Sequence, residues 1–415
     1  MKDSMKINFI KTIALFIALQ QSVFAFSGKI VDKNTLKPVP NAMVSDSRFS
    51  VKSDINGSFS IDSDEAILHI KAAGYRRYSL SCDIENFRIK LNPIKVKALY
   101  LSFWAASMNS TRSKRLLEII EKTEVNAIVV DVKNEYGSTS YKTSCNEANL
   151  NGADKQRTNR NIKKFIDLMK SKSIYTIARI VTFKDELQAS NNPSYAIKKS
   201  NGKIWRNHDN MAWVDPFDVR SHNYTIAIAE DAAKVGFDEI NFDYIRFPAK
   251  KGLILSKKNT QENRLKTIEM FLRSAQNKLR PYGVFISVDT YGNICWEDGD
   301  VGIGQKVESL AKYADYLAPM LYPSGFAKGS FNYENPSEHP YDVIYKSIKH
   351  IDHIIEPKRV RPWLQYFRDY AHKKRFYKKL EVTEQIRATC DIKTSGWMMW
   401  SPSSRYNLEY FNQLD

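Results

Sequence analysis

Cysteine is scarce in this sequence, and its four copies stand too far apart to form a short metal-binding or redox motif. They are Cys82, Cys145, Cys295 and Cys390, and no C-x-x-C pair occurs among them. This spacing excludes the usual cysteine-ligated metal centres. In an oxidising compartment four cysteines allow three complete pairings, and the spacing favours none of them.

Motifs of several enzyme classes are also missing. The chain has no G-x-S-x-G elbow for a serine nucleophile and no G-x-x-x-x-G-K-[ST] loop for phosphates. Histidine is rare, and although His350 and His353 stand one helical turn apart, no carboxylate-rich metal motif accompanies them. We therefore predict neither a cofactor nor a metal ion.

Long apolar runs are absent after the first 25 residues, which themselves have the order of a secretory leader. Three lysines in the first eleven residues precede an apolar stretch at 13–19 and a small-residue cleavage site that ends at Ala25. The apolar stretch is shorter than the roughly 20 residues of a spanning helix, although an uncleaved anchor is an alternative. We expect residues 1–25 to be a signal peptide and the protein to be exported, to the periplasm or the extracellular space. No membrane span is expected after cleavage.

Basic residues outnumber acidic ones, 63 to 46, so the formal net charge is +17. Removing the leader, with its three lysines and one aspartate, lowers this charge to +15. Such a charge favours acidic partners, among them anionic polysaccharides and lipid headgroups. Export argues against nucleic acid as a partner. The densest basic stretch, residues 358–379, is interpreted as a solvated face.

Residues 26–93 differ in their sequence pattern from the rest of the chain. Short β-prone runs are separated by turn signals such as D-I-N-G, and they cover 28–31, 42–44, 58–61, 67–72 and 87–91. This pattern predicts a small all-β sandwich. The successive motifs G-K-I-V-D, P-V-P-N-A, S-D-I-N-G-S-F and A-G-Y resemble those of carboxypeptidase-regulatory-like modules with a transthyretin-like fold. That resemblance implies a spacer or recognition unit without catalysis.

In residues 96–415, β-prone runs alternate with segments of helical period. We expect eight strands, at 98–103, 126–132, 175–181, 239–246, 284–289, 316–322, 361–366 and 396–400. Amphipathic segments between them predict helices at 113–122, 162–172, 223–235, 261–279, 343–355 and 382–390. Eight such units favour a closed (β/α)8 barrel over an open doubly wound sheet, the alternative. The predicted fold class is therefore α/β, a (β/α)8 (TIM) barrel preceded by a small all-β sandwich.

Acidic residues recur where the predicted strands end. In the fourth strand Asn241 and Asp243 share one face, and in the fifth Ser287 and Asp289 do the same. The apolar faces of these strands should meet the helices, and the polar faces should point into the barrel. Asp131 holds the corresponding position in the second strand. Barrel enzymes carry their active sites at this end of the strands.

Glycosidic cleavage requires two carboxyl groups, one to protonate the leaving oxygen and one to attack the sugar or activate water. Because adjacent strands lie about 4.8 Å apart, Asp243 and Asp289 can form such a pair. Asp131, two strands from Asp243, fits better as an inverting base or a substrate hydrogen-bonder. We predict Asp243 as the acid/base, Asp289 as its partner and Asp131 as a third catalytic candidate. A structural role in pinning loops is the alternative for each.

Other side chains near the strand ends are candidates for substrate binding. Cations there can keep a carboxylate ionised, and aromatic rings can stack on sugars. The candidates are Lys133, Arg179, Trp213, Asp215, Asn241, Arg246, Trp296, Tyr322, Gln365 and Trp400. Trp213, Trp296 and Trp400 are preferred among the aromatics because they flank the acidic positions or close the last strand.

Several motifs lie at these strand ends, among them G-F-D-E-I-N-F-D-Y-I-R-F-P at 236–248, V-D-V-K-N at 130–134, S-V-D-T-Y-G at 287–292 and R-P-W-L-Q at 361–365. Together they resemble a bacterial family of glycosyl-hydrolase-like domains of unknown function, over residues 96–405. The resemblance implies a glycoside-hydrolase-type barrel without a settled substrate. The family usually continues the last motif with an acidic residue. Tyr366 stands there instead, with Asp369 nearby, which disfavours a nucleophile from the seventh strand.

Chitinases of family 18 carry D-x-x-D-x-D-x-E on the fourth strand. Asn241 and Ile245 occupy the second-aspartate and glutamate positions here, so chemistry of that kind is disfavoured. The predicted function is a glycoside hydrolase acting on a cell-envelope or extracellular polysaccharide, for which an anionic polymer is one candidate. Two alternatives stay open: a non-catalytic carbohydrate-binding barrel, and an envelope interaction protein that uses the basic stretch and the β-module.

Overall fold

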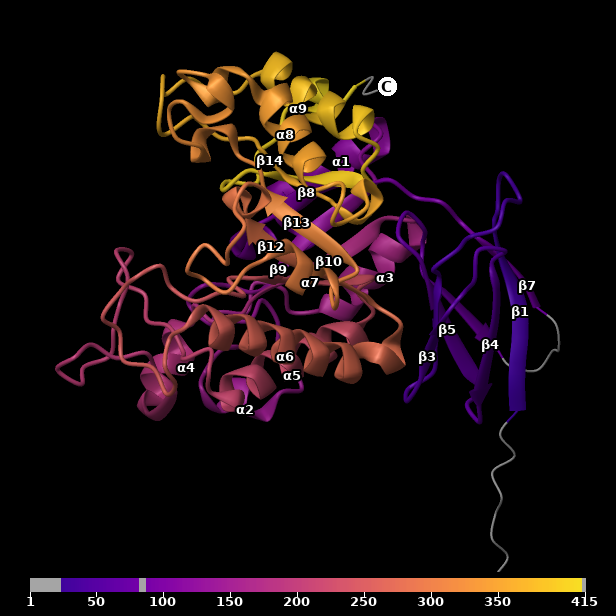
Figure 1. The fold of residues 1–415 in the computed structure, drawn as a ribbon, viewed down its shortest axis with the longest axis horizontal. Coiled ribbons are helices and arrows are strands. Elements are labelled where there is room, and N and C mark those ends of the chain that lie inside the picture. Colours follow the sequence, from indigo (N-terminus) through magenta and orange to yellow (C-terminus); the bar gives the residue numbers. More distant parts are fainter. Residues whose placement is uncertain (1–23, 82–86, 413–415) are drawn as a thin grey trace, which may run out of the picture.

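The computed structural model describes residues 24–81 and 87–412, which form two parts (Figure 1). The larger part is a closed barrel of eight parallel strands with helices around it. The smaller part, strands β1 to β7, is a pair of small β-sheets and is called the N-terminal module below. The predicted fold class, an α/β barrel preceded by a small all-β part, is confirmed.

The barrel strands follow one another around the barrel in sequence order, and β15 pairs with β8 to close it. They are β8 (Val96–Leu101), β9 (Ala127–Lys133), β10 (Tyr175–Val181), β11 (Glu239–Asp243), β12 (Phe285–Tyr291), β13 (Tyr316–Met320), β14 (Trp363–Gln365) and β15 (Gly396–Trp400). Only the fourth differs from its predicted bounds by more than two residues, since it ends at Asp243 and was predicted to reach Arg246. Tyr244 has a φ of 49°, in the left-handed region, and this turns the chain out of the sheet.

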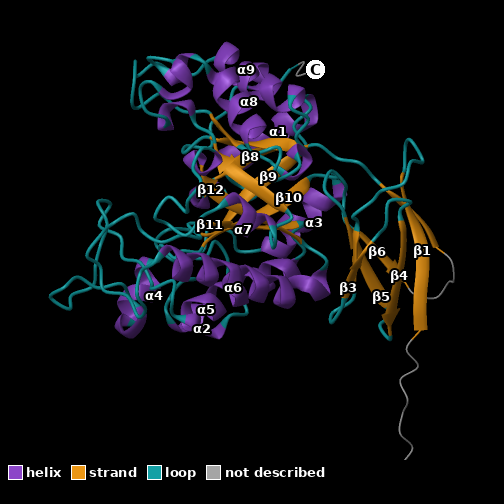
Figure 2. Ribbon diagram, in the orientation of Figure 1, coloured by secondary structure: helices purple, strands orange, loops and turns teal. Residues whose placement is uncertain are grey.

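Helices cover the outside of the barrel, as Figure 2 shows. They are α1 (Thr111–Lys122), α2 (Asn146–Leu150), α3 (Ile162–Ser171), α4 (Glu186–Asn191), α5 (Val219–Val235), α6 (Gln261–Leu279), α7 (Val307–Ala311), α8 (Pro340–His350) and α9 (Lys379–Asp391). The sequence did not indicate α2, α4 and α7, because five or six residues carry too little periodicity. Strands β9 and β10 are buried along their whole length, as parallel strands covered on both faces should be.

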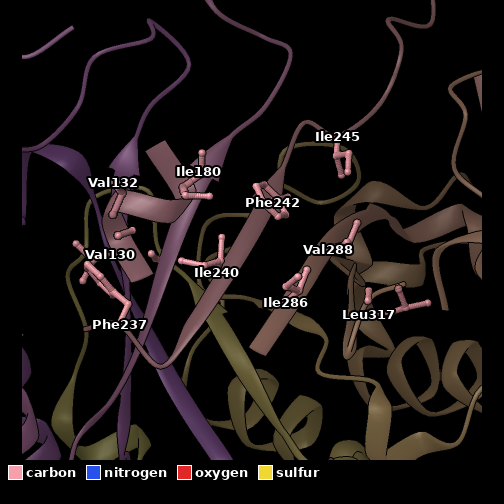
Figure 3. Close-up of a cluster of buried hydrophobic side chains, with 14 of the residues drawn as sticks. Val130, Val132, Ile180, Phe237, Ile240, Phe242, Ile245, Ile286, Val288 and Leu317 are labelled. Carbon is pink, nitrogen blue, oxygen red and sulfur yellow. The ribbon is translucent and has the colours of Figure 1, made fainter. Parts of the chain in front are cut away.

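Two apolar layers stabilise the barrel. The outer layer lies between strands and helices and includes Ile240, Phe242, Ile286 and Val288 (Figure 3). The inner layer fills the lumen with side chains from alternate strand positions, such as Ile177 of β10. The fourth and fifth strands therefore turn their apolar faces to the helices and their polar faces into the lumen, as predicted.

The N-terminal module consists of two sheets that share one apolar core. The first sheet has the strand order β4-β1-β7 and consists of β1 (Phe24–Asp32), β4 (Ser58–Ser63) and β7 (Phe87–Leu91). The second sheet has the strand order β3-β2-β5-β6 and consists of β2 (Met43–Ser45), β3 (Ser50–Lys52), β5 (Ile67–Lys71) and β6 (Tyr78–Ser81). Strands β3 and β6 were not predicted. The kinship with carboxypeptidase-regulatory-like modules and the domain boundaries stay predictions.

The N-terminal module contacts the barrel at the amino ends of the barrel strands. Lys71 forms an ion pair with Asp315, the residue before β13, at 2.6 Å. The backbone N–H of Gly74 donates to the hydroxyl of Tyr316, in β13, at 3.0 Å. Active sites of such barrels lie at the opposite, carboxyl end. The module is therefore attached to the face that does not carry the candidate site.

Cys145, Cys295 and Cys390 are unpaired, and Cys82 lies outside the described residues. A complete pairing of the four cysteines would join two of these three, so it is not formed. The predicted leader also lies outside the described residues, except for its last two residues, which begin β1 and pair with β4. Among the helices of the described chain, none combines the length and the apolarity that a bilayer crossing needs.

Barrel closure depends on Gly396, at the start of β15. Its φ is +106°, and a Cβ there would lie 2.0 Å from the carbonyl oxygen of Val96 in β8. We predict that Gly396→Ala lowers the free energy of unfolding by more than about 3 kcal/mol, because it combines backbone strain with a clash at the closing strand pair. Urea denaturation measures this loss.

Gly202→Ala is the matched control, since Gly202 has a φ of +78° but no atom within 4 Å of its added Cβ. Strain alone should cost this variant about 1 kcal/mol. Equal losses in the two variants would contradict the role given to the closing strand pair.

Candidate active site

A pocket of about 210 Å³, called the carboxylate pocket below, opens at the carboxyl ends of the barrel strands. Its wall combines acidic, basic and aromatic side chains: Glu135, Arg179, Asp243, Tyr244, Arg246, Asp289, Met320, Tyr322, Trp363 and Trp400. Of the predicted site residues, the pocket brings together Arg179, Asp243, Arg246, Asp289, Tyr322 and Trp400. These residues come from five different strands or the loops that follow them, which is how barrel enzymes build their sites.

Arg179, from β10, is the centre of the polar network. Its guanidinium donates to Asp131 at 2.7 Å, to Glu135 at 2.9 Å and, through Nε, to Asp243 at 2.9 Å. Burial opposes the charge of this guanidinium, but the three carboxylates outweigh burial and raise the pKa of Arg179 well above its usual value. The ring of Trp400 lies 5.1 Å from the guanidinium carbon and adds a cation–π contact. Arg179 is therefore a permanent cation between three carboxylates.

Asp131 lies in the lumen and does not line the carboxylate pocket. One of its oxygens accepts from the hydroxyl of Tyr100 at 2.5 Å and from the N–H of Phe103 at 3.3 Å, and the other accepts from Arg179. Burial raises its pKa, while the charge of Arg179 opposes that rise. With both oxygens engaged, Asp131 is placed to hold Arg179 rather than to touch a substrate.

Asp289, from β12, is almost completely buried, at 2% exposure, yet it lines the pocket. Its Oδ1 accepts from Asn241 Nδ2 at 2.8 Å and from Trp363 Nε1 at 2.7 Å. Burial, and then the negative charge of Asp243, raise the pKa of Asp289 well above its usual value. Because Oδ1 accepts both hydrogen bonds, a proton on this carboxyl is carried by Oδ2. Asn241 thus acts behind the pocket, by orienting Asp289.

Asp243 ends β11 beside Asp289, as the pairing of β11 with β12 requires. Besides Arg179, the backbone N–H of Tyr244 donates to it, at 2.6 Å. Tyr244 is the residue with the left-handed φ, a conformation that a bulky side chain adopts only under constraint from its surroundings. Its ring meets Trp213 edge to face at 5.7 Å, which supplies such a constraint. The turn therefore brings both the amide and the ring of Tyr244 to the pocket.

Glu135 is a pocket carboxylate that was not among the residues predicted from the sequence. It follows β9 by two residues, in a loop, and its side chain is 28% exposed. Nη2 of Arg179 binds both Glu135, at 2.9 Å, and Asp243, at 2.5 Å, so the two carboxylates share one cationic nitrogen. Burial opposes ionisation, but Arg179 outweighs it and lowers the pKa of Glu135. Its position just beyond a strand end was the available signal.

A second pocket of about 540 Å³ adjoins the first, because Arg246 lines both. We call it the tryptophan pocket; its wall contains Trp205, Arg206, Asn207, His208, Trp213, Arg246, Pro248, Ala249 and Lys250. The guanidinium carbon of Arg246 lies 5.1 Å from the centre of the Trp213 ring. Trp213, a predicted sugar-stacking residue, is thus a neighbour of the carboxylate pocket and not part of its wall.

Aromatic side chains also continue outward from Tyr322, in the wall of the carboxylate pocket. Tyr322 meets Phe367 at 5.2 Å between ring centres, and Phe367 stacks on Tyr370 at 6.1 Å. Tyr370 is 60% exposed. Rings that could contact sugars are therefore present both in the tryptophan pocket and beyond Tyr322.

Four further predicted binding residues lie outside both pockets. Lys133 is completely buried and forms an ion pair with Asp185 at 2.7 Å. Asp215 accepts from the backbone N–H of Ser256 and of Phe217, so it holds two loop segments together. Their positions in the sequence, at a strand end or in a nearby loop, indicated that these side chains lie near the barrel mouth. Those positions could not show that each side chain is engaged by a local contact.

The other two are Trp296 and Gln365. Trp296 stacks on His350 at 4.4 Å and donates to the hydroxyl of Ser347, so it packs against α8. Gln365 is completely buried and bonds Ser324 through its side-chain amide. Both hold the loops around the pocket in place.

Asp369, in the loop after β14, likewise has a local role. It accepts from the backbone N–H of Ala371 and of His372 and from the hydroxyl of Ser337. Burial acts to raise the pKa of Asp369, but these hydrogen bonds outweigh burial and lower the pKa to about 2. Of the described residues, no acidic one from β14 or this loop lines the carboxylate pocket.

Within the described parts of the chain, no group of three or more histidine, cysteine, aspartate or glutamate side chains is arranged to hold a metal ion. The guanidinium of Arg179 occupies the place between carboxylates where a cation could otherwise lie. What the pocket offers is acid, base and hydrogen-bonding chemistry between aromatic walls.

A closed (β/α)8 barrel with paired carboxyl groups and aromatic rings at its carboxyl end defines a glycoside-hydrolase-like domain. Residues 98–406 match the family DUF4015, described as a putative glycosyl hydrolase domain, and this chain belongs to that family. No curated protein matches the chain.

Solved structures with the same architecture include glycoside hydrolases. The PgaB (BpsB) glycoside hydrolase domain from Bordetella bronchiseptica matches 77% of this chain and 99% of its own, with 12% identity and a TM-score of 0.53. The alpha-L-fucosidase isoenzyme 2 from Paenibacillus thiaminolyticus matches 77% of this chain and 48% of its own, with 11% identity and a TM-score of 0.53. At these identities the likeness shows the fold alone. A hypothetical protein from Ruminiclostridium thermocellum is 35% identical over 46% of this chain and 96% of its own, with a TM-score of 0.42.

The raised pKa of Asp289 has a consequence for stability. From its ordinary value of 3.8 upward, the folded protein holds a proton on Asp289 that the unfolded chain has released, so stability falls as pH rises toward the folded pKa. Asn has the shape of the protonated carboxyl and no charge to bury. We predict that Asp289→Asn is more stable than the wild type at pH 7, by at least about 1 kcal/mol, and that the difference vanishes near pH 4. Thermal unfolding across this pH range measures it.

Asp369→Asn is a control of opposite sign. The lowered pKa of Asp369 stabilises the fold above pH 3.8, and this contribution is lost as pH falls toward 2. This variant should be less stable than the wild type at pH 7, by about 2 kcal/mol. If Asp289→Asn were also destabilised at pH 7, burial would not be what governs the Asp289 carboxyl.

Proposed function

We propose that this protein is a glycoside hydrolase that cleaves a polysaccharide with a pair of carboxyl groups. The proposal depends above all on Asp289 and Asp243, which lie side by side in one pocket but have opposite surroundings. Asp289 is enclosed in the lumen and has a raised pKa, whereas Asp243 receives hydrogen bonds from a cation. When the environments of two neighbouring carboxyl groups favour different protonation states, one group can act as the acid and the other as the anion.

In this mechanism Asp289 is the proton donor. Its carboxyl protonates the oxygen of the scissile bond, and the C–O bond breaks. The carboxylate of Asp243 faces the positive charge that develops at the anomeric carbon. Water supplies the hydroxyl of the new reducing end and returns a proton to Asp289.

This assignment exchanges the roles that were predicted from the sequence, where Asp243 was the acid/base. The reason is the hydrogen bonding of Asp243, whose partners Arg179 and the Tyr244 amide are all donors. Such surroundings suit a carboxylate, which only accepts hydrogen bonds. Asp131, which lies behind Arg179, supports this arrangement without touching the substrate.

The substrate we propose is a polymer of the cell envelope or the extracellular space. The tryptophan pocket and the rings of Phe367 and Tyr370 add surface beyond the carboxyl groups, which suits several linked sugars. The location follows from the leader-like order of residues 1–25, which favours export to the periplasm or beyond.

Reducing-end release from a panel of bacterial exopolysaccharides and peptidoglycan tests the proposal. We predict that Asp289→Asn and Asp243→Asn each lower kcat by about 10²- to 10⁴-fold, the range for general acid–base groups. Glu135→Gln should lose less, because it removes one of three carboxylates around Arg179. Activity should persist well above pH 4, because the proton donor has a raised pKa, and should fall as Asp289 ionises.

Asp167→Asn, an exposed aspartate on α3, is the matched control and should keep full activity. Wild-type turnover by either Asp289→Asn or Asp243→Asn would contradict the assignment. A protein that binds one of these polymers tightly but cleaves none of it would instead be a non-catalytic carbohydrate-binding barrel.

A further inference from the structure

Arg246, which is partly buried, differs from the buried arginines at the barrel strands. Arg179 is bound to three carboxylates, and Arg361 forms an ion pair with Glu239 at 2.6 Å. Among the described residues, no carboxylate forms an ion pair with Arg246, and its guanidinium donates one hydrogen bond, to the carbonyl oxygen of Phe247 at 3.2 Å. Most of its five N–H donors thus stay available to a ligand.

Aromatic rings, rather than a paired carboxylate, surround the guanidinium of Arg246. The guanidinium carbon lies 5.1 Å from the centre of the Trp213 ring and 5.3 Å from that of Tyr244. Burial lowers the pKa of Arg246, and the nearby Tyr244, Asp243 and Tyr291 do not offset this. A partly buried cation without a partner anion destabilises the free protein, and a bound anion would remove that cost.

The tryptophan pocket around Arg246 is basic. Arg206, His208 and Lys250 share its wall with Arg246, and no acidic side chain of the described residues lines it. Arg206 is already paired with Glu186, whereas Arg246 is partly buried and has no carboxylate partner. A pocket with this wall selects a ligand that has both a flat apolar face and a negative charge.

We propose that the substrate is an acidic polysaccharide, and that a carboxylate-bearing sugar binds in the tryptophan pocket with its ring against the partly exposed Trp205 and its carboxylate on Arg246. This proposal rests on the proposed function, because Arg246 also lines the carboxylate pocket, where the bond would be cleaved. A carboxylate is planar and matches the guanidinium with two parallel hydrogen bonds. The bound acidic sugar is therefore a neighbour of the scissile bond.

Calorimetric titration of the full chain tests the proposal. The probes are hexamers of polygalacturonate and of alginate, the same hexamers with their carboxyl groups reduced to alcohols, and sulfated dextran hexamers, all in 0.3 M NaCl to screen the general positive charge. We expect the wild type to bind at least one uronate hexamer 10-fold or more tighter than its reduced form. Arg246→Gln should lose that preference.

A matched control accompanies Arg246→Gln. Arg273→Gln removes a cation on the exposed face of α6, away from both pockets, and should keep the preference within about 2-fold. Arg246→Gln should unfold at the same temperature as the wild type or higher, because it removes a partly buried charge that has no carboxylate partner. If Arg246→Gln is folded but has lost the preference, the loss is due to recognition of the ligand and not to unfolding.

Several results would overturn this proposal. They are equal binding of uronate and reduced hexamers, tighter binding of the sulfated hexamers, a preference that survives Arg246→Gln, and no binding of any uronate hexamer. Cleavage of a neutral polymer that requires Asp289 would then leave the proposed function standing. Conversely, Arg246-dependent uronate binding by a protein that cleaves nothing would support the acidic ligand and overturn the hydrolase.

Discussion

The guanidinium of Arg179 holds the carboxyl end of this barrel together. Parallel pairing of β9, β10 and β11 places Arg179 beside Asp131 on one side and next to the end of β11 on the other, so one cation reaches carboxylates from two neighbouring strands and a loop. Carboxylates this deeply buried would be costly without such a partner. The positions of Asp243 and Glu135, and through Asp243 the electrostatics of Asp289, all depend on it.

The two ends of the barrel use buried charge differently. Near the amino end Glu239 and Arg361 pair with each other, and the N-terminal module contacts that face through Lys71 and Gly74. At the carboxyl end the network is open: Asp289 has a raised pKa, Glu135 is partly exposed and Arg246 lacks a carboxylate partner. Paired charge stabilises a scaffold, whereas incompletely paired charge is available for a ligand.

Alternation along single strands was enough to predict the central pair of carboxyls. Asp243 and Asp289 lie on the lumen side because their neighbours Phe242 and Val288 pack against helices. Successive side chains of a strand point to opposite faces, so this placement can be predicted from the sequence alone. Positions beyond the strand ends were not predictable in this way. Glu135 lies in a loop, and Asp215 and Trp296 satisfy loop and helix contacts, which alternation does not encode. The turn at Tyr244 also went unseen, since only packing against Trp213 shows why a bulky residue takes a left-handed φ there.

The sequence by itself determined the eight strands, the faces they bury and the lumen position of two aspartates, because each follows from local hydrophobic period and short-range geometry. Only the tertiary structure decided the pKa and the pairing partners of each charged group. The raised pKa of Asp289, the three partners of Arg179 and the lack of a carboxylate partner for Arg246 depend on burial and on contacts between residues dozens of positions apart. Electrostatic free energies depend on such distances and on exclusion of water, and neither is a property of the chain until it closes into a barrel.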